Sequence, residues 1–235
     1  YGVDLQIEEG SLVGVLGPNG AGKSTLIKTV MNMIKPNGGY VKIFGKSPKS
    51  GIKRIGYIPQ RESIDWDFPV TVFDVVLMGR YGHHGWLGRI GKEDRRKASE
   101  CLEQVNMLPY SDRPIGNLSG GQQQRVFLAR ALAQESAVYL MDEPFAGVDA
   151  VTEKAIVSIL QGMKDEGKTL VVVHHDLSSA REYFDQLLLL NMRKVAFGPV
   201  AEVYTHELLQ KTYGGKLTVL SEMATETARN AYASK

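Results

Sequence analysis

The sequence has little of what marks a secreted, membrane-spanning or nucleic-acid-binding chain. It contains a single cysteine, Cys101, so no internal disulfide can form and a reducing compartment is expected. No apolar run approaches the ~20 residues that cross a bilayer. The start, Tyr1-Gly2-Val3-Asp4, lacks the basic and apolar regions of a secretory signal. Neither sign of charge dominates, because 28 basic and 26 acidic residues give a net charge of +2, and this gives no argument for a nucleic-acid partner.

What is present is the composition of a folded domain, 43% hydrophobic and 23% charged over 235 residues, which excludes disordered and fibrous classes. Short apolar runs alternate with helical patterns, which predicts an α/β fold with a mostly parallel sheet covered on both faces. Strands are predicted at 12–16, 40–44, 54–58, 137–141 and 169–173, and a hairpin at 187–190 and 194–197. Helices are predicted at 23–34, after Thr71, after Gly91, from Ser119 to about Gln134 and after Asp149.

A glycine-rich turn directly after the first predicted strand carries the strongest chemical signal. Its sequence, Gly17-Pro18-Asn19-Gly20-Ala21-Gly22-Lys23-Ser24-Thr25, fits the phosphate-binding loop at every fixed position and opens a helix. Glycines let successive backbone N–H groups point at phosphate oxygens, and the helix N-terminus adds partial positive charge. We predict that Lys23 contacts the β- and γ-phosphates of a nucleotide and that Ser24 ligates Mg²⁺. A glycine turn with a solvated lysine is the alternative.

A second signal is the apolar strand that ends in Asp142-Glu143. Two carboxylates at a strand end are costly unless a cation lies there, and a phosphate loop elsewhere in the chain suggests Mg²⁺. We expect Asp142 to hold the ion, directly or through water, and Glu143 to orient or deprotonate an attacking water. The alternative is that Asp142-Glu143-Pro144 only begins a surface turn.

A third signal is Leu118-Ser119-Gly120-Gly121-Gln122, a serine-capped helix start with two glycines that leave backbone amides bare. This is a second anion-binding device. Because the phosphate loop already provides one cradle, the second must serve another anion or another copy of the nucleotide.

Together these motifs resemble the nucleotide-binding subunit of an ATP-binding cassette (ABC) transporter, for which Leu-Ser-Gly-Gly-Gln is the defining motif. The resemblance covers nearly the whole chain. It implies a P-loop NTPase fold with a RecA-like ATP-binding core at 1–62 and 117–213, a helical subdomain inserted at 63–116, a small antiparallel β element and a peripheral tail at 214–235. It also implies a homodimer packed head to tail, in which Ser119, Gly120, Gly121 and Gln122 close over the γ-phosphate held by the partner's loop.

Further family elements match by position. Tyr57-Ile58-Pro59-Gln60 resembles the Q-loop, whose Gln60 contacts Mg²⁺ and the attacking water and senses the membrane subunit. Ala146-Gly147-Val148-Asp149 resembles the D-loop at the dimer interface. The H-loop histidine precedes an aspartate, so the resemblance favours His175 over His174. It implies an ATPase with Mg²⁺ as cofactor and Lys23, Gln60, Glu143 and His175 in catalytic roles. The aromatic residue that stacks on adenine has only Tyr1 as a candidate.

Within the family, the segments around Gln60-Arg61, Met78-Gly79-Arg80 and His174-His175-Asp176 resemble the manganese, zinc and iron branch of bacterial metal importers. This implies a subunit at the cytoplasmic face of the membrane, bound to a permease and served by an extracytoplasmic metal-binding protein, with manganese as the first expectation and zinc or iron as alternatives. We expect no transport-metal site in this chain, because adjacent histidines such as His83-His84 point apart. The loop 81–88, with Trp86, either faces a partner or is an ordinary exposed loop. An exporter cassette and a soluble ABC protein that acts on nucleic acid are the remaining alternatives.

Overall fold

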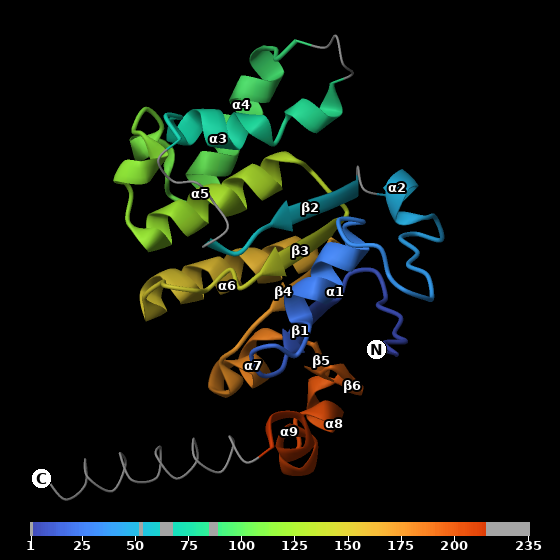
Figure 1. The fold of residues 1–235 in the computed structure, drawn as a ribbon. Helices are drawn as coiled ribbons and strands as arrows, with labels where there is room; N and C mark the ends of the chain where they lie inside the picture. The colour runs from blue at the N-terminus through green and yellow to red at the C-terminus, as the bar shows by residue number, and fades with distance from the viewer. Residues whose placement is uncertain (1, 52–53, 62–67, 85–88, 215–235) are drawn as a thin grey trace, which may run out of the picture. The chain divides into compact units, whose positions relative to one another are not determined.

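The computed structural model describes residues 2–51, 54–61, 68–84 and 89–214 (Figure 1). Tyr1, Trp86 and the tail after Gly214, on which predictions were made, lie outside these ranges. The described residues form two compact units, one that lies within residues 1–6, 13–23 and 175–235 and another that lies within residues 7–12 and 24–174. The division into a core and an inserted subdomain at 63–116 stays a prediction.

The first unit contains the strand that leads into the phosphate loop and a hairpin from later in the chain. Strand β1 (Leu12–Leu16) pairs in parallel with β5 (Gln186–Asn191), and β5 pairs antiparallel with β6 (Arg193–Pro199). Met192, with a φ of +58°, makes the turn of this hairpin, which confirms the prediction. The described residues of this unit also form the helices α7 (Leu177–Tyr183), α8 (Val200–Val203) and α9 (His206–Tyr213).

The second unit holds the strands β2 (Ile55–Ile58), β3 (Val138–Asp142) and β4 (Thr169–Val173), paired in parallel with β3 between the other two. All five residues of β4 are buried, as expected for a parallel strand covered on both faces. With the hairpin of the first unit, this confirms the prediction of a mostly parallel α/β fold with one antiparallel pair.

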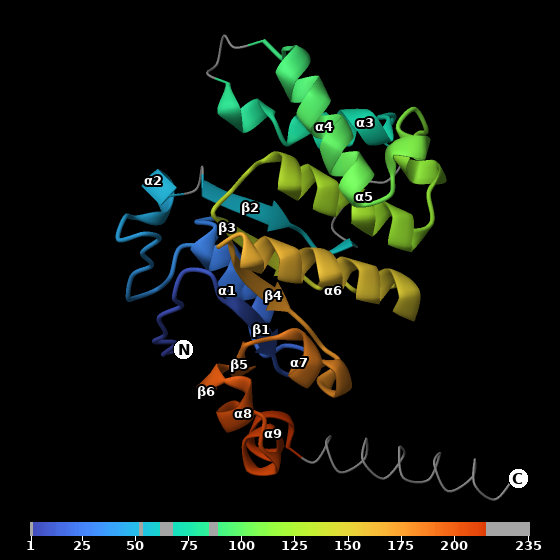
Figure 2. The same ribbon diagram turned by 180° about the vertical axis from the view of Figure 1, so that it is seen from behind.

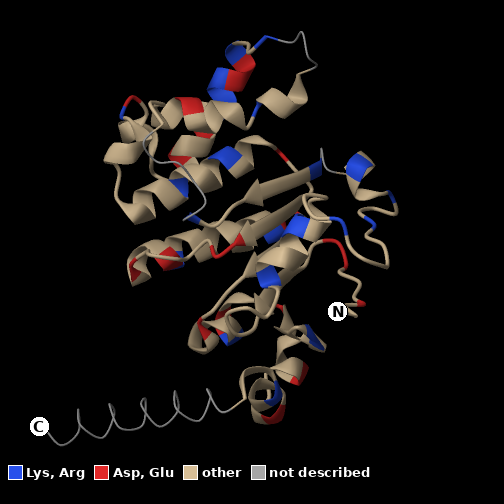
Figure 3. Cartoon of the chain, viewed as in Figure 1, with Lys and Arg blue, Asp and Glu red and all other residues tan. Residues whose placement is uncertain are grey.

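Helices surround these strands, and their starts follow from local capping. Thr71 caps α3 (Val72–Met78) in a capping box with Asp74, Ser119 caps α5 (Gly120–Ala133), and Asp149 caps α6 (Ala150–Asp165). The described residues of this unit also form α1 (Lys23–Val30), α2 (Pro48–Gly51), α4 (Lys92–Gln104), η3 (Tyr81–His83), η4 (Leu108–Tyr110) and η5 (Ile115–Asn117). Helices α3, α4 and α5 pack against one another, as both views show (Figures 1 and 2). Acidic and basic residues alternate along α4 (Figure 3).

Two predicted elements are wrong in extent or kind. The helix expected at 23–34 ends at Val30, because Asn32 takes a φ of +56° and the N–H groups of Met33 and Ile34 both return to the Lys28 carbonyl. The strand expected at 40–44 is not formed. Phe44 (φ +50°) and Gly45 (φ +72°) make a tight turn instead, closed by an isolated bridge between residues 43 and 46. Apolar side chains here do not enter a sheet, and the Phe44 ring packs under the Arg54 guanidinium at 3.7 Å.

Candidate nucleotide site

The loop between β1 and α1 has the geometry of a phosphate cradle. Gly20 and Gly22 have φ angles of +81° and +96°, a conformation that favours glycine. A Cβ atom at Gly17 would lie 2.0 Å from the Leu190 carbonyl oxygen of β5, so only glycine fits there. The Ala21 carbonyl accepts a hydrogen bond from Met192 N at 3.0 Å. The hairpin of the first unit therefore holds the loop in shape.

Lys23 folds over the loop that precedes it. Its Nζ donates to the carbonyl oxygens of Gly17 at 2.7 Å and of Pro18 at 3.1 Å, and the residue is only 7% exposed. An ammonium group carries three N–H donors, so these two bonds set its direction. The structure places the Lys23 charge at the loop itself, where the sequence predicts phosphate.

Ser24 and Asp142 meet although 118 residues separate them. Ser24, in the first turn of α1, donates from Oγ to Oδ1 of Asp142 at 3.1 Å. Asp142 ends β3 and is 1% exposed. A hydroxyl and a carboxylate oxygen in contact are the hard ligands that Mg²⁺ takes, so the residues present fit that ion.

Gln60 and Glu143 follow neighbouring parallel strands at the same sheet edge. Ile58 of β2 lies opposite Met141 of β3, so both residues leave the sheet just past this pair. Burial raises the pKa of Tyr57 on β2, and the negative charge of Asp142 on the neighbouring strand raises it further. Glu143 is half-buried and takes a φ of +56°, a strained conformation of the kind found at functional sites.

The two histidines after β4 differ in their surroundings. His174 is 1% exposed, and its ring packs edge-on against Phe145 at 5.2 Å between ring centres. His175 is exposed. His174 is thus packed in the core, whereas His175 lies at the surface; a contact of His175 with the γ-phosphate stays a prediction.

The second predicted anion-binding device is the start of α5, here called the α5 tip: Ser119 is exposed, and Gly120, Gly121 and Gln122 are half-buried. Ser119 Oγ accepts from Gln122 N at 3.4 Å, and Gln122 Oε1 accepts from Ser119 N at 2.9 Å. This reciprocal pair is a capping box that fixes the first turn of α5. Beside it, a Cβ atom at Gly121 would lie 3.3 Å from Cγ2 of Thr152 on α6.

The D-loop segment begins α6 next to this tip. Asp149 Oδ1 accepts from Val151 N at 3.0 Å and from Thr152 N at 2.9 Å. These bonds, the one from the Thr152 backbone first, hold the pKa of the Asp149 carboxyl below its usual value. Gly147, with a φ of +70°, makes the preceding turn.

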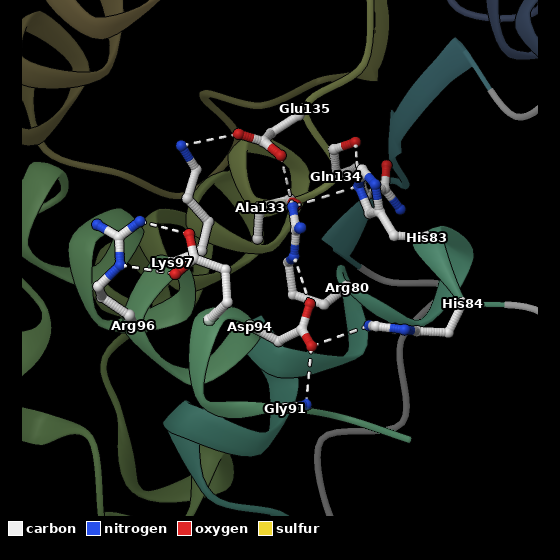
Figure 4. A network of polar contacts seen from close by, with 11 residues as sticks. Arg80, His83, His84, Gly91, Asp94, Arg96, Lys97, Ala133, Gln134 and Glu135 are labelled. Atoms are coloured by element: carbon white, nitrogen blue, oxygen red, sulfur yellow. Dashed lines mark hydrogen bonds and ion pairs between the residues drawn. The ribbon is translucent and has the colours of Figure 1, made fainter. Parts of the chain in front are cut away.

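The opposite end of α5 is anchored by a polar network around Arg80 (Figure 4). Arg80 Nη1 donates to the Ala133 carbonyl and to Glu135 Oε2, both at 2.7 Å, and Nε donates to Asp94 Oδ1 at 3.2 Å. Lys97 Nζ lies 2.8 Å from Glu135 Oε1. The bonds from Lys97 and Arg80 lower the pKa of Glu135 to about 2. The network therefore ties the end of α5 to α4 and to the segment after α3.

Asp94 completes this network at the start of α4. Its Oδ2 accepts from Gly91 N and lies in contact with His84 Nε2, each at 2.9 Å (Figure 4). The Gly91 bond, followed by the one to His84, lowers the pKa of Asp94. His83, the residue before His84, contacts the Gln134 carbonyl through Nε2 at 3.0 Å. Both histidines thus have structural partners within the subunit.

Two residues that the motifs did not single out for a role stand next to the α5 tip. Arg61, directly after Gln60, donates from Nε and Nη2 to Oε1 of Gln123, at 3.2 and 3.0 Å. No local pattern signals such a pair, because 62 residues separate its members; only its position beside two motifs hints at it.

Membrane-spanning helices and clusters of metal-binding side chains were sought among the described residues. None of their helices combines the length and apolar character needed to span a bilayer. Nor do those same ranges bring three or more histidine, cysteine, aspartate or glutamate side chains into a possible metal-binding group. Cys101 is buried, which raises the pKa of its thiol to about 11.

Comparison with known proteins places the chain among close relatives. The family model described as ABC transporter matches residues 1–146. The manganese transport system ATP-binding protein MntB of Bacillus subtilis is 57% identical over 220 residues, which cover 94% of this chain and 88% of that protein. The zinc transport system ATP-binding protein TroB of Treponema pallidum is 53% identical over 218 residues, 93% of this chain and 82% of that protein.

Solved structures agree. A metal-chelate type ABC transporter in an inward-facing conformation matches with a TM-score of 0.80 at 28% identity, over 88% of this chain and 79% of that one. The dimeric structure of a bacterial ABC transporter cassette matches with a TM-score of 0.75 at 31% identity, over 84% of this chain and 89% of that one. A dimeric cassette in a post-hydrolysis state, bound to ADP and Pi, matches with a TM-score of 0.74 at 30% identity, over 84% of this chain and 89% of that one.

Proposed function

The chain belongs to the ABC transporter family and is an ATP-hydrolysing cassette, and from this premise we propose that it energises bacterial uptake of a transition-metal ion, manganese first. The observation that carries the nucleotide chemistry is the contact of Ser24 with Asp142 beside the phosphate loop. The names of the manganese relatives support the choice of metal. Zinc is the second candidate, because a zinc transport relative is 53% identical.

In this proposal the phosphate loop binds ATP through its backbone amides. Gly17, Pro18, Asn19, Gly20, Ala21, Gly22 and Thr25 shape the cradle, and Lys23 places its charge at the β- and γ-phosphates. Ser24, Asp142 and Gln60 would hold Mg²⁺, which neutralises phosphate charge when bound.

The reaction is attack of a water oxygen on the γ-phosphorus, with cleavage of its bond to the bridging oxygen of the departing ADP. Glu143 accepts the proton of that water, and Gln60 orients the water from the neighbouring strand end. His175 donates a hydrogen bond to a γ-phosphate oxygen. Catalysis is mainly positioning and electrostatic stabilisation, because phosphoryl transfer asks little covalent chemistry of the protein.

The α5 tip acts in trans. Ser119, Gly120, Gly121 and Gln122 of one protomer close over the γ-phosphate bound by the other, so ATP holds a homodimer together and hydrolysis releases it. The subunit lies at the cytoplasmic face of the membrane through a permease. An extracytoplasmic metal-binding protein serves that permease and reaches this chain only indirectly. The segment 63–116 is the inserted subdomain that contacts the permease.

The test of the metal is uptake into vesicles by the reconstituted transporter, supplied with Mn²⁺, Zn²⁺ or Fe²⁺ at equal free concentrations. We expect ATP-dependent Mn²⁺ accumulation above that of the other two ions. A matched transporter with Glu143→Gln cassettes controls for leakage. Preferential Zn²⁺ uptake would replace manganese by the second candidate, and no uptake of any of the three would contradict metal import.

A further inference from the structure

Arg61 lies next to three motifs that are far apart in the sequence: the Q-loop, the α5 tip and the D-loop. A Cβ atom at Gly120 would lie 3.3 Å from the guanidinium carbon of Arg61 and 3.3 Å from the Gly147 carbonyl oxygen. A Cβ atom at Gly147 would lie 3.9 Å from Arg61 Nη1. The guanidinium therefore lies against the half-buried backbone of the α5 tip at Gly120 and beside the D-loop turn at Gly147, and Arg61 directly follows Gln60 in the chain.

The acceptor of Arg61 is itself held rigidly. Gln123 is 3% exposed, and its Nε2 donates to the Ile115 carbonyl at 3.3 Å. This bond leaves Oε1 as the atom that faces Arg61, where it accepts from both Nε and Nη2. Gln123 N also donates to the Ser119 carbonyl at 2.9 Å, inside the first turn of α5. A displacement of Arg61 is thus passed to the turn that carries the α5 tip.

The charge of Arg61 adds a second effect. A guanidinium stays protonated at any physiological pH, so its positive charge is permanent. Within contact of Gly120, that charge adds to the partial charge of the helix N-terminus at the surface offered to an anion.

We propose that Arg61 is a positioning residue that couples the nucleotide site of its own protomer, through the adjoining Gln60, to the α5 tip that the same protomer offers to the partner's nucleotide. The inference rests on the proposed function. It makes the two ATP sites of a dimer interdependent, because the state of each site sets the geometry of the tip that completes the other.

The test compares full-length chains in the Glu143→Gln background, in which ATP-bound dimers accumulate. Arg61→Met keeps the apolar stem but removes the donors and the charge, and Arg61→Lys keeps the charge with a single ammonium. Arg96→Met is the matched control, since Arg96 is an exposed arginine of α4 that pairs with Glu93 and Glu100 of the same helix. Dimer formation with ATP is measured by analytical ultracentrifugation, and ATP affinity of the monomer by equilibrium dialysis.

We expect Arg61→Met to weaken ATP-induced dimerisation by about tenfold, within the usual 5–150-fold range of coupling between sites. Monomer affinity for ATP and the melting temperature should stay as in the parent, and Arg61→Lys should recover part of the loss. With Glu143 restored, the Hill coefficient for ATP hydrolysis should fall toward 1. Gln123→Leu combined with Arg61→Met should cost less than the two losses added, because both remove one interaction.

Dimerisation of Arg61→Met equal to that of Arg96→Met would overturn the inference while leaving the proposed function intact. A fall in melting temperature that accounts for the loss would also overturn it, because the role would then be structural. If the parent and the Arg96→Met control themselves fail to dimerise with ATP, the proposed function is what fails.

Discussion

At the carboxyl end of β3, Glu143 holds a left-handed backbone with a φ of +56°. A residue with a side chain pays about 1–3 kcal/mol for such a conformation, which persists only where the surrounding structure imposes it. Asp142 before it is buried and bonded to Ser24, so the chain has little freedom to relax. At this strand end, one carboxylate is buried against Ser24 and the next, that of Glu143, belongs to a half-buried residue.

Glu143→Gln tests the role of that second carboxylate. The amide keeps the size of the side chain but cannot accept a proton, so we expect hydrolysis to fall by about 10²–10⁴-fold, the usual contribution of a general base. ATP binding should persist and the ATP-bound dimer should accumulate. Phosphate release and sedimentation measure the two effects. Unchanged hydrolysis would remove Glu143 from the mechanism.

At the scale of the element, α5 is held at both ends. Its first turn is fixed by the Ser119–Gln122 capping box and by Arg61 on Gln123, and its last residue by Arg80 on the Ala133 carbonyl. A helix fixed at both ends moves as a body, so its tip is carried with the α3 and α4 segments that Arg80 joins.

Ser119→Arg tests whether the α5 tip closes over the nucleotide bound by the partner. The long charged side chain would occupy the space over the α5 tip, so we expect ATP-induced dimerisation to be lost while ATP binding to the monomer is retained. Ser158→Arg, a substitution at an exposed site of α6, is the control for the added charge. Normal dimerisation of Ser119→Arg, measured by sedimentation with ATP, would contradict the trans arrangement.

The Arg80 network gives α5 an acid-sensitive anchor. The folded-state pKa of Glu135, about 2, lies below its ordinary value of 4.5, so its pairing stabilises the fold above pH 4.5 and this contribution is lost as pH falls toward 2. We expect Glu135→Gln to flatten the pH dependence of unfolding free energy in that window. Urea unfolding between pH 2 and 6 checks this, with Glu103→Gln on exposed α4 as the control. An unchanged slope would contradict the assignment.

At the scale of the whole molecule, ligand binding and assembly are linked to stability. ATP that binds the folded chain alone stabilises it by about 2.7 kcal/mol at a hundred times its dissociation constant. We therefore expect ATP with Mg²⁺ to raise the melting temperature, and this shift to grow with protein concentration in the Glu143→Gln variant because the dimer is stabilised too.

Lys23→Ala provides the comparison for this thermal shift. Loss of the ammonium held over the loop should abolish nucleotide binding and with it the shift. Lys28→Ala, at the exposed last turn of α1, removes an equal charge and should leave the shift intact. A full shift in Lys23→Ala would count against the phosphate-loop assignment.

Many features of this protein could be predicted from short segments of its sequence. The phosphate loop, the carboxylate pair after β3, the capped start of α5 and the alternation of apolar strands with helices all follow from spacing within a few residues, because turns, caps and strand ends are set by neighbouring backbone geometry. On the same ground the metal-import family could be identified from its motifs. The strand expected at 40–44 failed because its β-forming residues flank a left-handed turn at Phe44, which composition does not reveal.

Only the tertiary structure decided which long-range neighbours meet. It buried His174 against Phe145 and exposed His175, brought Ser24 to Asp142, joined Arg80 to the end of α5, and set Arg61 between the α5 tip and the D-loop turn. Contacts across tens of residues depend on how whole elements pack. The contacts of a side chain such as Arg61 therefore depend on the packing of segments that are distant in the sequence.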